Sequence, residues 1–246
     1  MNSPAAHFRD LLSPSSRARY VAWRMLGGRS SIRVTLRSGL RLKIRALATT
    51  DYGVAWDIFW RHCYQCPEPL RTVNHIVDLG SNVGYSCLYW CTRYPHARVT
   101  AFEPHPEHLK ALQEHLAANQ VVERVEVLPA AAGTSEKMMY LSDAGSSSSI
   151  TQDRMGYAVK MLDVFERITD EVDILKIDIE GGEYGLLADP RFSLLRPRAV
   201  VVEWHRTTDQ PDGKGWCLKQ FEKLGYRTVI GVEDLPLAGL IWALRD

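Results

Sequence analysis

The sequence predicts an α/β fold whose core is a mostly parallel, Rossmann-like sheet with an antiparallel C-terminal edge strand. From residue 75 onward, short apolar runs alternate with stretches of helical period, which is typical of strands joined by crossover helices. The first of these runs ends in a glycine-containing turn of the kind that leads a strand directly into a helix. The length of 246 residues fits one such domain with a small appendage.

Residues 1–72 are expected to form a helical and hairpin extension on the substrate side of a main domain over residues 73–246. The first 30 residues carry five arginines, one acid and interleaved apolar side chains, which predicts one or two short amphipathic helices. Such helices pack on the domain, cover a pocket or rest on a membrane surface, and we expect packing. Strict alternation then predicts a half-buried hairpin over 32–36 and 40–44.

An aromatic-rich helix is expected next, over residues 52–64, with Asp51 as its N-cap. Beyond it, apolar runs bounded by turn residues predict the strands of the main sheet. The parallel strands are expected at 75–79, 98–102, 124–128, 172–178 and 199–204, and an antiparallel C-terminal pair at 226–231 and 240–244.

The most informative segment is the turn after the first of these strands, where Asp78 precedes Gly80 and Gly84. Glycines there let backbone N–H groups approach a ligand closely. The turn is not a dinucleotide fingerprint, because Asn82 stands where the second glycine would fall. Asp78 would repel a pyrophosphate, whereas S-adenosylmethionine carries a sulfonium, an ammonium and no phosphate. The charge argument therefore favours S-adenosylmethionine over a nicotinamide dinucleotide.

A second acidic anchor, Glu103, stands at the end of the next strand. A carboxylate at this strand tip can accept hydrogen bonds from both hydroxyls of a ribose. Together with the turn before it, Glu103 predicts a nucleoside site at the carboxyl edge of the sheet.

Several motifs in one order carry a resemblance to a known family. They are Val77-Asp-Leu-Gly-Ser-Asn-Val-Gly84, Ala101-Phe-Glu-Pro-His-Pro106, Ala130-Ala-Ala-Gly133, Met161-Leu-Asp163, Leu175-Lys-Ile-Asp-Ile-Glu-Gly-Gly-Glu183 and Val201-Val-Glu-Trp-His205. This series resembles the FkbM family of class I S-adenosylmethionine-dependent methyltransferases. The resemblance implies a Rossmann-like methyltransferase domain over residues 73–246 and O-methylation of a hydroxyl, commonly on a sugar or a secondary metabolite.

The resemblance also assigns a cofactor site. The turn would hold the methionine portion of S-adenosylmethionine, Glu103 the ribose, and Pro129 and Ala130 the adenine. The Ser-rich stretch from Ser147 to Ile150 resembles a segment that the family carries before its Leu-Asp motif. The expected cofactor-binding residues are Asp78, Gly80, Ser81, Asn82, Gly84, Tyr85, Ser86, Glu103, Pro104, Ala130 and Asp178.

Catalysis is expected at the ends of the fourth and fifth strands, which should be neighbours. Lys176, Asp178 and Glu180 alternate onto one face, as do Glu203 and His205. A hydroxyl is a poor nucleophile, and an imidazole oriented by a carboxylate is a suitable base for it. We expect His205 as base, Asp178 or Glu203 orienting it or the substrate, and Lys176 balancing the carboxylates.

Other interpretations of these residues stay open. Asp178 could itself act as the base or contact the donor, and Asp178, Glu180 and Glu203 could ligate magnesium, although the pattern requires no metal. Zinc at Cys63 and Cys66 is disfavoured, because four converging ligands are not evident. We expect His108 and His115 on a solvated helix face. Trp23, Trp56 and Trp60 are expected in the core more often than in a stacking wall.

Composition limits the partners. A formal net charge of +1 gives no general attraction to nucleic acid, and no apolar run reaches the length of a membrane span. Five cysteines and no secretory signal suit a reducing cytoplasm. We therefore expect a cytoplasmic enzyme that acts on a small hydroxylated acceptor. We expect no nucleic-acid partner and no stable membrane insertion, and the sequence is compatible with a homodimer. The alternatives are methylation of RNA or protein and, less favoured, a nucleotide-dependent oxidoreductase.

Overall fold

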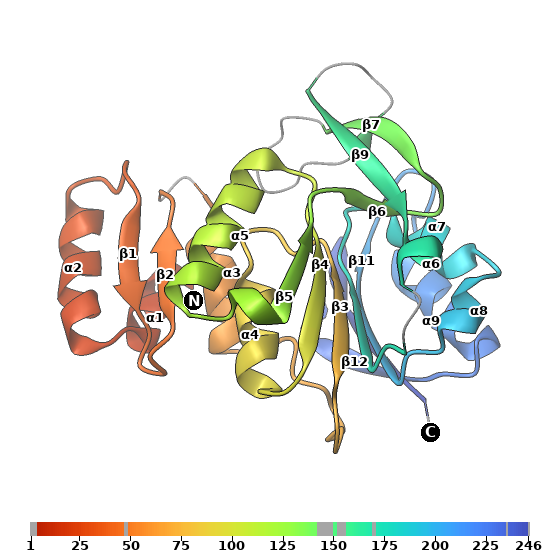
Figure 1. Ribbon diagram of the computed structural model, residues 1–246. Helices are drawn as coiled ribbons and strands as arrows, with labels where there is room; N and C mark the ends of the chain where they lie inside the picture. The colour runs from red at the N-terminus through yellow and green to blue at the C-terminus, as the bar shows by residue number, and fades with distance from the viewer. Residues whose placement is uncertain are drawn as a thin grey trace.

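The computed structural model describes residues 4–46, 49–141, 150–151, 156–168, 171–234 and 236–245 (Figure 1). Ser147 to Ser149 of the Ser-rich stretch lie outside these ranges, so the expectation attached to them stays untested. The described chain builds a large central sheet with helices on both faces, a smaller sheet above it and an N-terminal unit at one side.

The central sheet has seven strands in the order β12-β13-β11-β10-β3-β4-β5. The strands from β11 to β5 are parallel, and β13 runs antiparallel to both of its neighbours. This confirms the predicted mostly parallel sheet with an antiparallel C-terminal edge. The strands are β3 (His75–Leu79), β4 (Arg98–Phe102), β5 (Val125–Leu128), β10 (Ile174–Ile177), β11 (Ala199–His205), β12 (Arg227–Asp234) and β13 (Ala238–Leu244).

The path of the chain through this sheet reverses between β3 and β10. From β3 the chain moves outward to β4 and β5, and it then returns to pair β10 with the other edge of β3. In open α/β sheets, ligands bind beyond the carboxyl ends of the strands at such a reversal. The reversal therefore predicts where the site lies.

Two helical layers bury the two faces of the sheet (Figure 1). Each layer has its own apolar core, one including Trp90 and Leu112 and the other including Phe192 and Phe221. Burial on both faces explains why all five residues of β3 are buried. One layer holds α4 (Tyr85–Arg93) and α5 (Pro106–Ala118), and the other holds α7 (Glu183–Ala188), α8 (Phe192–Leu195) and α9 (Gly213–Lys223).

The smaller sheet was not predicted. Its order is β6-β9-β7-β8, and it lies above the central sheet in Figure 1. Its strands are short or only partly buried, so no long apolar run marks them. They are β6 (Ala131–Gly133), β7 (Lys137–Leu141), β8 (Ile150–Thr151) and β9 (Tyr157–Asp163), and α6 (Val164–Arg167) follows them. A short 3-10 turn, Val122–Arg124, precedes β5.

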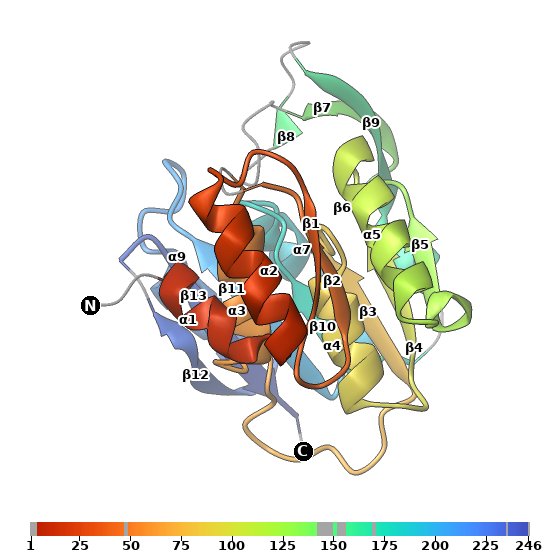
Figure 2. The same cartoon turned by 90° about the vertical axis from the view of Figure 1, so that its left-hand side faces the viewer.

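The N-terminal unit packs on the α4–α5 side of the sheet (Figure 2). Its hairpin is fixed to α5, since the Lys43 backbone N–H donates to Nε2 of His115 and Asn119 exchanges two hydrogen bonds with the Arg41 backbone, all at 2.8 Å. The hairpin is as predicted, with alternating burial. The unit comprises α1 (Pro4–Leu11), α2 (Pro14–Met25), β1 (Ile32–Thr35), β2 (Arg41–Ile44) and α3 (Asp51–Phe59).

Two local predictions were wrong. The aromatic helix α3 ends at Phe59 rather than residue 64, and Asp51 is its first residue rather than its N-cap, because the Asp51 carboxylate accepts hydrogen bonds from Arg45. His108 and His115 are buried rather than solvated, with exposed fractions of 6% and 2%. Among the described residues, no helix is long and apolar enough to cross a membrane.

Candidate active site

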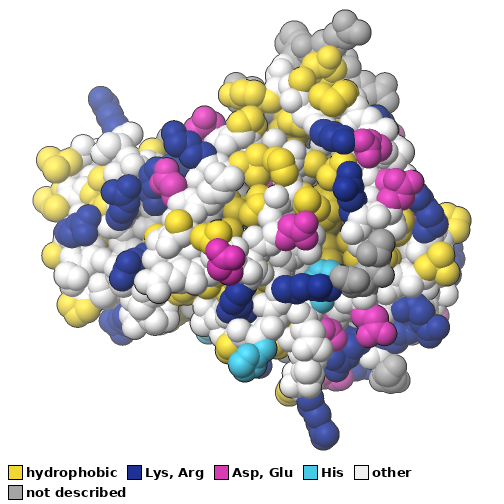
Figure 3. All heavy atoms as spheres, in the orientation of Figure 1, with side chains coloured by type: hydrophobic (Ala, Val, Ile, Leu, Met, Phe, Trp, Pro, Cys, Tyr) yellow, Lys and Arg dark blue, Asp and Glu magenta, His cyan; other side chains and the backbone are white. Residues whose placement is uncertain are grey.

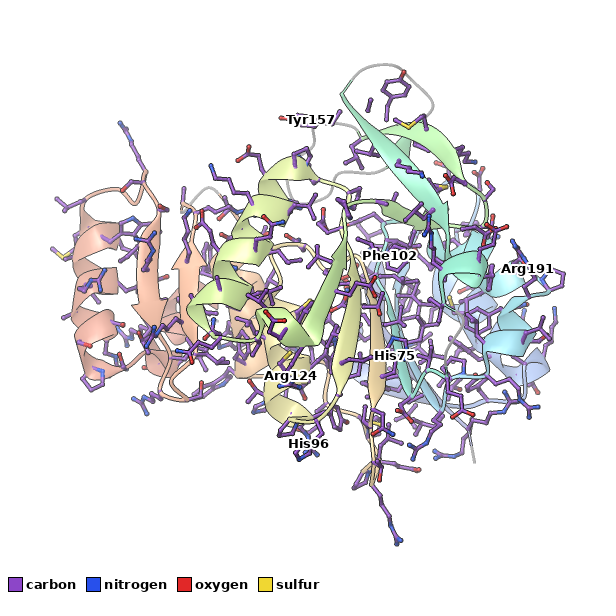
Figure 4. The ribbon with its side chains drawn as sticks, in the orientation of Figure 1. His75, His96, Phe102, Arg124, Tyr157 and Arg191 are labelled. Carbon is purple, nitrogen blue, oxygen red and sulfur yellow. The ribbon has the colours of Figure 1, made fainter. Side chains whose placement is uncertain are left out.

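Two adjoining cavities open at the predicted reversal. The first cavity lies between the turn after β3 and the smaller sheet, and its wall includes Phe102, which is labelled in Figure 4. The second cavity lies between the same turn and α3, and its wall includes Tyr64. Both cavities are lined by Gly80, Asn82, Asp178 and Glu180.

Glu103, directly after β4, is held in place in the first cavity by the backbone. One of its carboxylate oxygens accepts from the Asn82 N–H and the other from the His105 N–H, both at 2.8 Å. Nδ1 of His108 lies 3.4 Å from the oxygen that faces His105. Each carboxylate oxygen can still accept a second hydrogen bond. Glu103 is therefore oriented in advance to receive the hydroxyls of a ligand.

The smaller sheet supplies another wall of the first cavity. Ala131, Ala132 and Leu141 line it from β6 and β7. Tyr157 of β9, which is labelled in Figure 4, packs edge-on against His105, with ring centroids 5.0 Å apart. Small apolar side chains therefore face Glu103 across the cavity.

Lys176 of β10 ties together the loops that follow β3 and β10. Its ammonium nitrogen lies 3.1 Å from Oδ1 of Asp78 and 3.3 Å from Oδ2 of Asp178, and it donates to the Gly80 carbonyl at 2.8 Å. Burial alone would lower the pKa of Lys176, but the charges of Asp78 and Asp178 raise it above its ordinary value. Lys176 therefore stays charged in the buried sheet.

The same loops approach each other too closely for any residue but glycine at position 80. Gly80 has φ +82°, and a Cβ atom there would lie 1.8 Å from the Asp178 carbonyl oxygen. The close approach brings the Asp178 side chain to the wall of both cavities.

His205, at the end of β11, has a carboxylate near each ring nitrogen. Nδ1 lies 2.9 Å from Oε1 of Glu183, so Nδ1 carries the hydrogen that the carboxylate accepts. Nε2 lies 3.6 Å from Oε2 of Glu180 and 3.9 Å from Oε1 of Glu203. Glu183 is fully buried, and its other oxygen accepts from the Gly181 N–H at 2.8 Å. Glu183 and His205 therefore form an oriented carboxylate–imidazole dyad.

A tight turn after β10 explains this arrangement. Glu180 has φ +52° and Gly181 has φ +100°, both in the left-handed region. Two consecutive left-handed residues redirect the chain within a few residues, so that α7 begins at Glu183. Glu180 and Glu183, three residues apart, thereby reach opposite nitrogens of one imidazole.

The clustered carboxylates shift the pKa values of the site. Repulsion from Asp178, followed by burial, raises the pKa of Glu203 to about 8. Burial alone would lower the pKa of His205, but the hydrogen bond and charge of Glu183, followed by Asp178 and Glu203, raise it to about 9. The site thus holds excess negative charge and retains protons, which favours a cationic ligand.

Comparison with known proteins shows the family of this chain. Residues 78–228 match the methyltransferase FkbM domain, which is more than half of the chain. The chain belongs to the FkbM methyltransferase family. It is also 27% identical over 197 residues to the methyltransferase sdnD of Sordaria araneosa, covering 63% of this chain and 75% of that protein.

Solved structures show the same class I methyltransferase fold. The FkbM methyltransferase from Methylobacillus flagellatus KT superposes with a TM-score of 0.55 at 16% identity, over 98% of this chain and 58% of that one. Fibrillarin from Aeropyrum pernix, solved with natively bound S-adenosyl-L-methionine, gives a TM-score of 0.50 at 12% identity, over 87% of this chain and 94% of that one. The chain spans about three fifths of the FkbM chain of known structure.

The FkbM fold distributes the sequence-predicted residues over three places. Gly80, Asn82, Glu103, Pro104 and Asp178 line the first cavity. Ser81, Tyr85, Ser86, Asp178 and Glu203 line the second, and His205 stands beside Glu180 and Glu203 of that wall. Asp78, Gly84 and Ala130 line neither cavity.

These last three residues have structural surroundings that the sequence did not reveal. Asp78 is fully buried and is bound to Lys176 and to the indole N–H of Trp90, at 3.2 Å, rather than facing the cavity. Gly84 is the N-cap residue of α4 and has φ +86°. Ala130 packs in the core, and the apolar wall expected from it is formed by the next two residues.

Glu183 and Tyr64 are site residues that the sequence did not reveal. The expected orienting contact to Nδ1 of His205 comes from Glu183 rather than from Asp178 or Glu203. Tyr64 lines the second cavity, with its hydroxyl 3.5 Å from Oδ2 of Asp178. Trp60, which was expected in the core, is 49% exposed and lines a different pocket. The Glu-Gly-Gly-Glu183 motif was the available signal for Glu183, since it places a carboxylate at the start of a helix.

A cation could also be held beside the dyad. One ligand atom from each of Asp178, Glu203 and His205 lies within 4.8 Å of the other two. The magnesium alternative taken from the sequence contained Glu180 in place of His205. Since this cluster also contains the expected base, a metal and a free imidazole base are competing uses of the same side chains.

Proposed function

We propose that this protein is an S-adenosylmethionine-dependent O-methyltransferase that acts on a hydroxyl of a small molecule, such as a sugar or a secondary metabolite. The observation that carries the proposal is the charge of the first cavity. Glu103, Asp178 and Glu180 line it, and its described lining residues include no Lys or Arg. Such a wall suits a cationic nucleoside and disfavours the pyrophosphate of a dinucleotide.

The residues of the first cavity fit S-adenosylmethionine. The fixed carboxylate of Glu103 suits ribose hydroxyls, Ala131 and Ala132 suit the adenine face, and the turn from Gly80 to Asn82 with Asp178 suits the charged methionine portion. When bound, S-adenosylmethionine supplies an electrophilic methyl group on positively charged sulfur. The side chains at the junction of the two cavities then govern which acceptor reaches that group.

The second cavity is the proposed acceptor site. Val54 and Ile58 of α3 give it an apolar wall, while Tyr64, Asp178 and Glu203 supply polar groups that can orient hydroxyls. Because α3 belongs to the N-terminal part, residues 1–72 would act as a cap over the acceptor and residues 73–246 as the methyltransferase domain. A cavity enclosed in this way favours a small acceptor over RNA or protein.

In this proposal His205 accepts the proton of the acceptor hydroxyl at Nε2. Glu183 holds the imidazole in the tautomer with hydrogen on Nδ1, which leaves Nε2 as the basic atom. His205 must first lose its own proton, and a cation bound among the carboxylates promotes this loss by offsetting their charge. Glu203 and Asp178 position the acceptor, and Lys176 keeps Asp178 in place.

The proposal is tested with methyl-labelled S-adenosylmethionine, the purified protein and a cell extract that is separated after the reaction into low-molecular-weight, RNA and protein fractions. We expect label in a low-molecular-weight product whose methyl group mass spectrometry places on oxygen. Label in the RNA or protein fraction, or on nitrogen or carbon, would contradict the proposal. A parallel reaction with a chelator, with and without added magnesium, decides whether Asp178, Glu203 and His205 hold a metal during turnover.

A further inference from the structure

The helix α2 buries one face and leaves an apolar face in solvent. Tyr20 and Trp23 point into the core, whereas Val21, Met25 and the following Leu26 are 41%, 83% and 86% exposed. Met25 and Leu26 have the highest exposed fractions among the large apolar side chains of the described residues. In Figure 3, apolar side chains mark the left edge of the molecule, where Figure 1 places α2.

Arginines border this apolar face on both sides. At 3.6 residues per turn, Arg17 and Arg24 lie along one border of the helix and Arg19 lies along the other. On the Arg19 side, exposed Arg33 and Arg41 of the hairpin line the same groove as Arg19. Dark-blue side chains accordingly gather around the left edge in Figure 3.

Positive charge is concentrated in the N-terminal part of the chain, and the remainder is acidic. Residues 1–46 contain ten Lys and Arg and one acid, whereas the other 200 residues contain 20 Lys and Arg against 28 Asp and Glu. The net charge of +1 conceals this division. Since the N-terminal unit is strongly basic, its partner should be anionic.

We propose that α2 docks the protein peripherally on an anionic lipid bilayer, with Val21, Met25 and Leu26 in the interface and the arginines on the headgroups. An amphipathic helix with an apolar face and basic borders suits this position, because arginine stems lie along the apolar surface while their heads reach the phosphates. Anionic lipids supply the complementary charge.

The observations favour a bilayer over other anionic or apolar partners. A second copy of this chain would bring two basic units together, and their repulsion opposes a dimer through this face. Single-stranded nucleic acid requires exposed rings for stacking, but Tyr20 and Trp23 of α2 are buried. The docked unit is also connected to the proposed acceptor site, because α1 packs on α3.

Flotation with phosphatidylcholine vesicles, with and without phosphatidylglycerol, tests the proposal on the full chain. We expect binding only to the vesicles with phosphatidylglycerol, and weaker binding as salt is raised. Met25→Ser/Leu26→Ser should lower the partition coefficient by about tenfold or more. Arg17→Gln/Arg24→Gln should lower it by roughly fivefold for each arginine replaced.

Matched variants separate docking from other effects. Met138→Ser/Leu194→Ser removes exposed apolar side chains of 62% and 77% exposure elsewhere and should leave vesicle binding unchanged. The serine variants should keep the thermal unfolding temperature of the parent. Arg17→Gln/Arg24→Gln should lower it only slightly, because it removes the partly exposed Arg17–Asp10 pair and the contact of Arg24 with the Tyr20 ring. The S-adenosylhomocysteine affinity should be that of the parent in every variant, so the result does not depend on the proposed enzymatic activity. Equal binding to both vesicle types, equal loss in the Met138 and Leu194 control, or a dimer abolished by Met25→Ser/Leu26→Ser would each overturn the proposal.

Discussion

His205→Gln should lower the rate of methyl transfer by roughly 10²–10⁴-fold, the usual contribution of a positioned general base. Nε2 is the atom that Glu183 leaves free to accept a proton, and glutamine cannot take its place. Affinity for S-adenosylhomocysteine should be unchanged, because His205 does not line the first cavity. The measurement pairs single-turnover methyl transfer with calorimetry.

The matched control is His96→Gln, an exposed histidine that is labelled in Figure 4 and precedes β4, whereas His205 stands at the carboxyl end of the parallel β11. It should leave both rate and affinity unchanged. Full activity in His205→Gln would refute the assignment of His205 as base and move it to Asp178, whose Asp178→Asn variant would then lose the activity instead.

Glu183 should act as a positioning residue, and the pH profile distinguishes this from a purely structural role. The base must be deprotonated, so activity should rise with pH. Glu183 raises the pKa of His205 and therefore shifts this increase in activity to higher pH. In Glu183→Gln, the rise should occur at lower pH and the plateau rate should fall. In His205→Gln, the residual rate should lose this pH dependence.

Lys176→Met should destabilise the fold by about 3–5 kcal/mol, since it leaves the buried charge of Asp78 without its cation. For a chain of this length, the unfolding temperature should fall by roughly 10 °C. The variant also removes the hydrogen bond to the Gly80 carbonyl and the ion pair that holds Asp178 in place. The affinity for S-adenosylmethionine should therefore fall as well. Thermal unfolding followed by circular dichroism measures the first effect.

Two variants make this prediction specific to the buried charge. Lys176→Met/Asp78→Asn should recover most of the stability, because neither buried charge remains. Lys160→Met removes an exposed lysine whose nitrogen lies 2.5 Å from Glu136, and exposed pairs of this kind contribute little to stability because water screens them. A loss in Lys160→Met as large as in Lys176→Met would show that the effect does not come from burial.

The parallel sheet could be predicted because its strands are buried on both faces, so that unbroken apolar runs mark them in the sequence. The smaller sheet could not, since the three residues of β6 and the half-exposed strands β7 and β9 carry no such pattern. The bounds of α3 were also hidden. Its start depends on Arg45, which takes the Asp51 carboxylate, and the left-handed backbone of His62 follows shortly after its end at Phe59.

In the site, the sequence located the segments that meet but not the direction of every side chain. Asp78 was expected to face the ligand because it precedes a glycine turn, yet its partner Lys176 lies 98 residues further along the chain. Glu183 was missed because its contact with His205 depends on two consecutive left-handed residues, Glu180 and Gly181. A glutamate rarely adopts this conformation, so the sequence does not predict it at Glu180.

The central claim is that the turn after β3 and Glu103 hold S-adenosylmethionine, and calorimetric titration of S-adenosylhomocysteine tests it most directly. The parent protein should bind one equivalent, NADH should not bind, and Glu103→Gln should lower the affinity by about 10–100-fold through lost charge-assisted hydrogen bonds. The exposed neighbour variant Glu107→Gln should bind as the parent does. No heat from the parent protein, or an unchanged affinity in Glu103→Gln, would contradict the account.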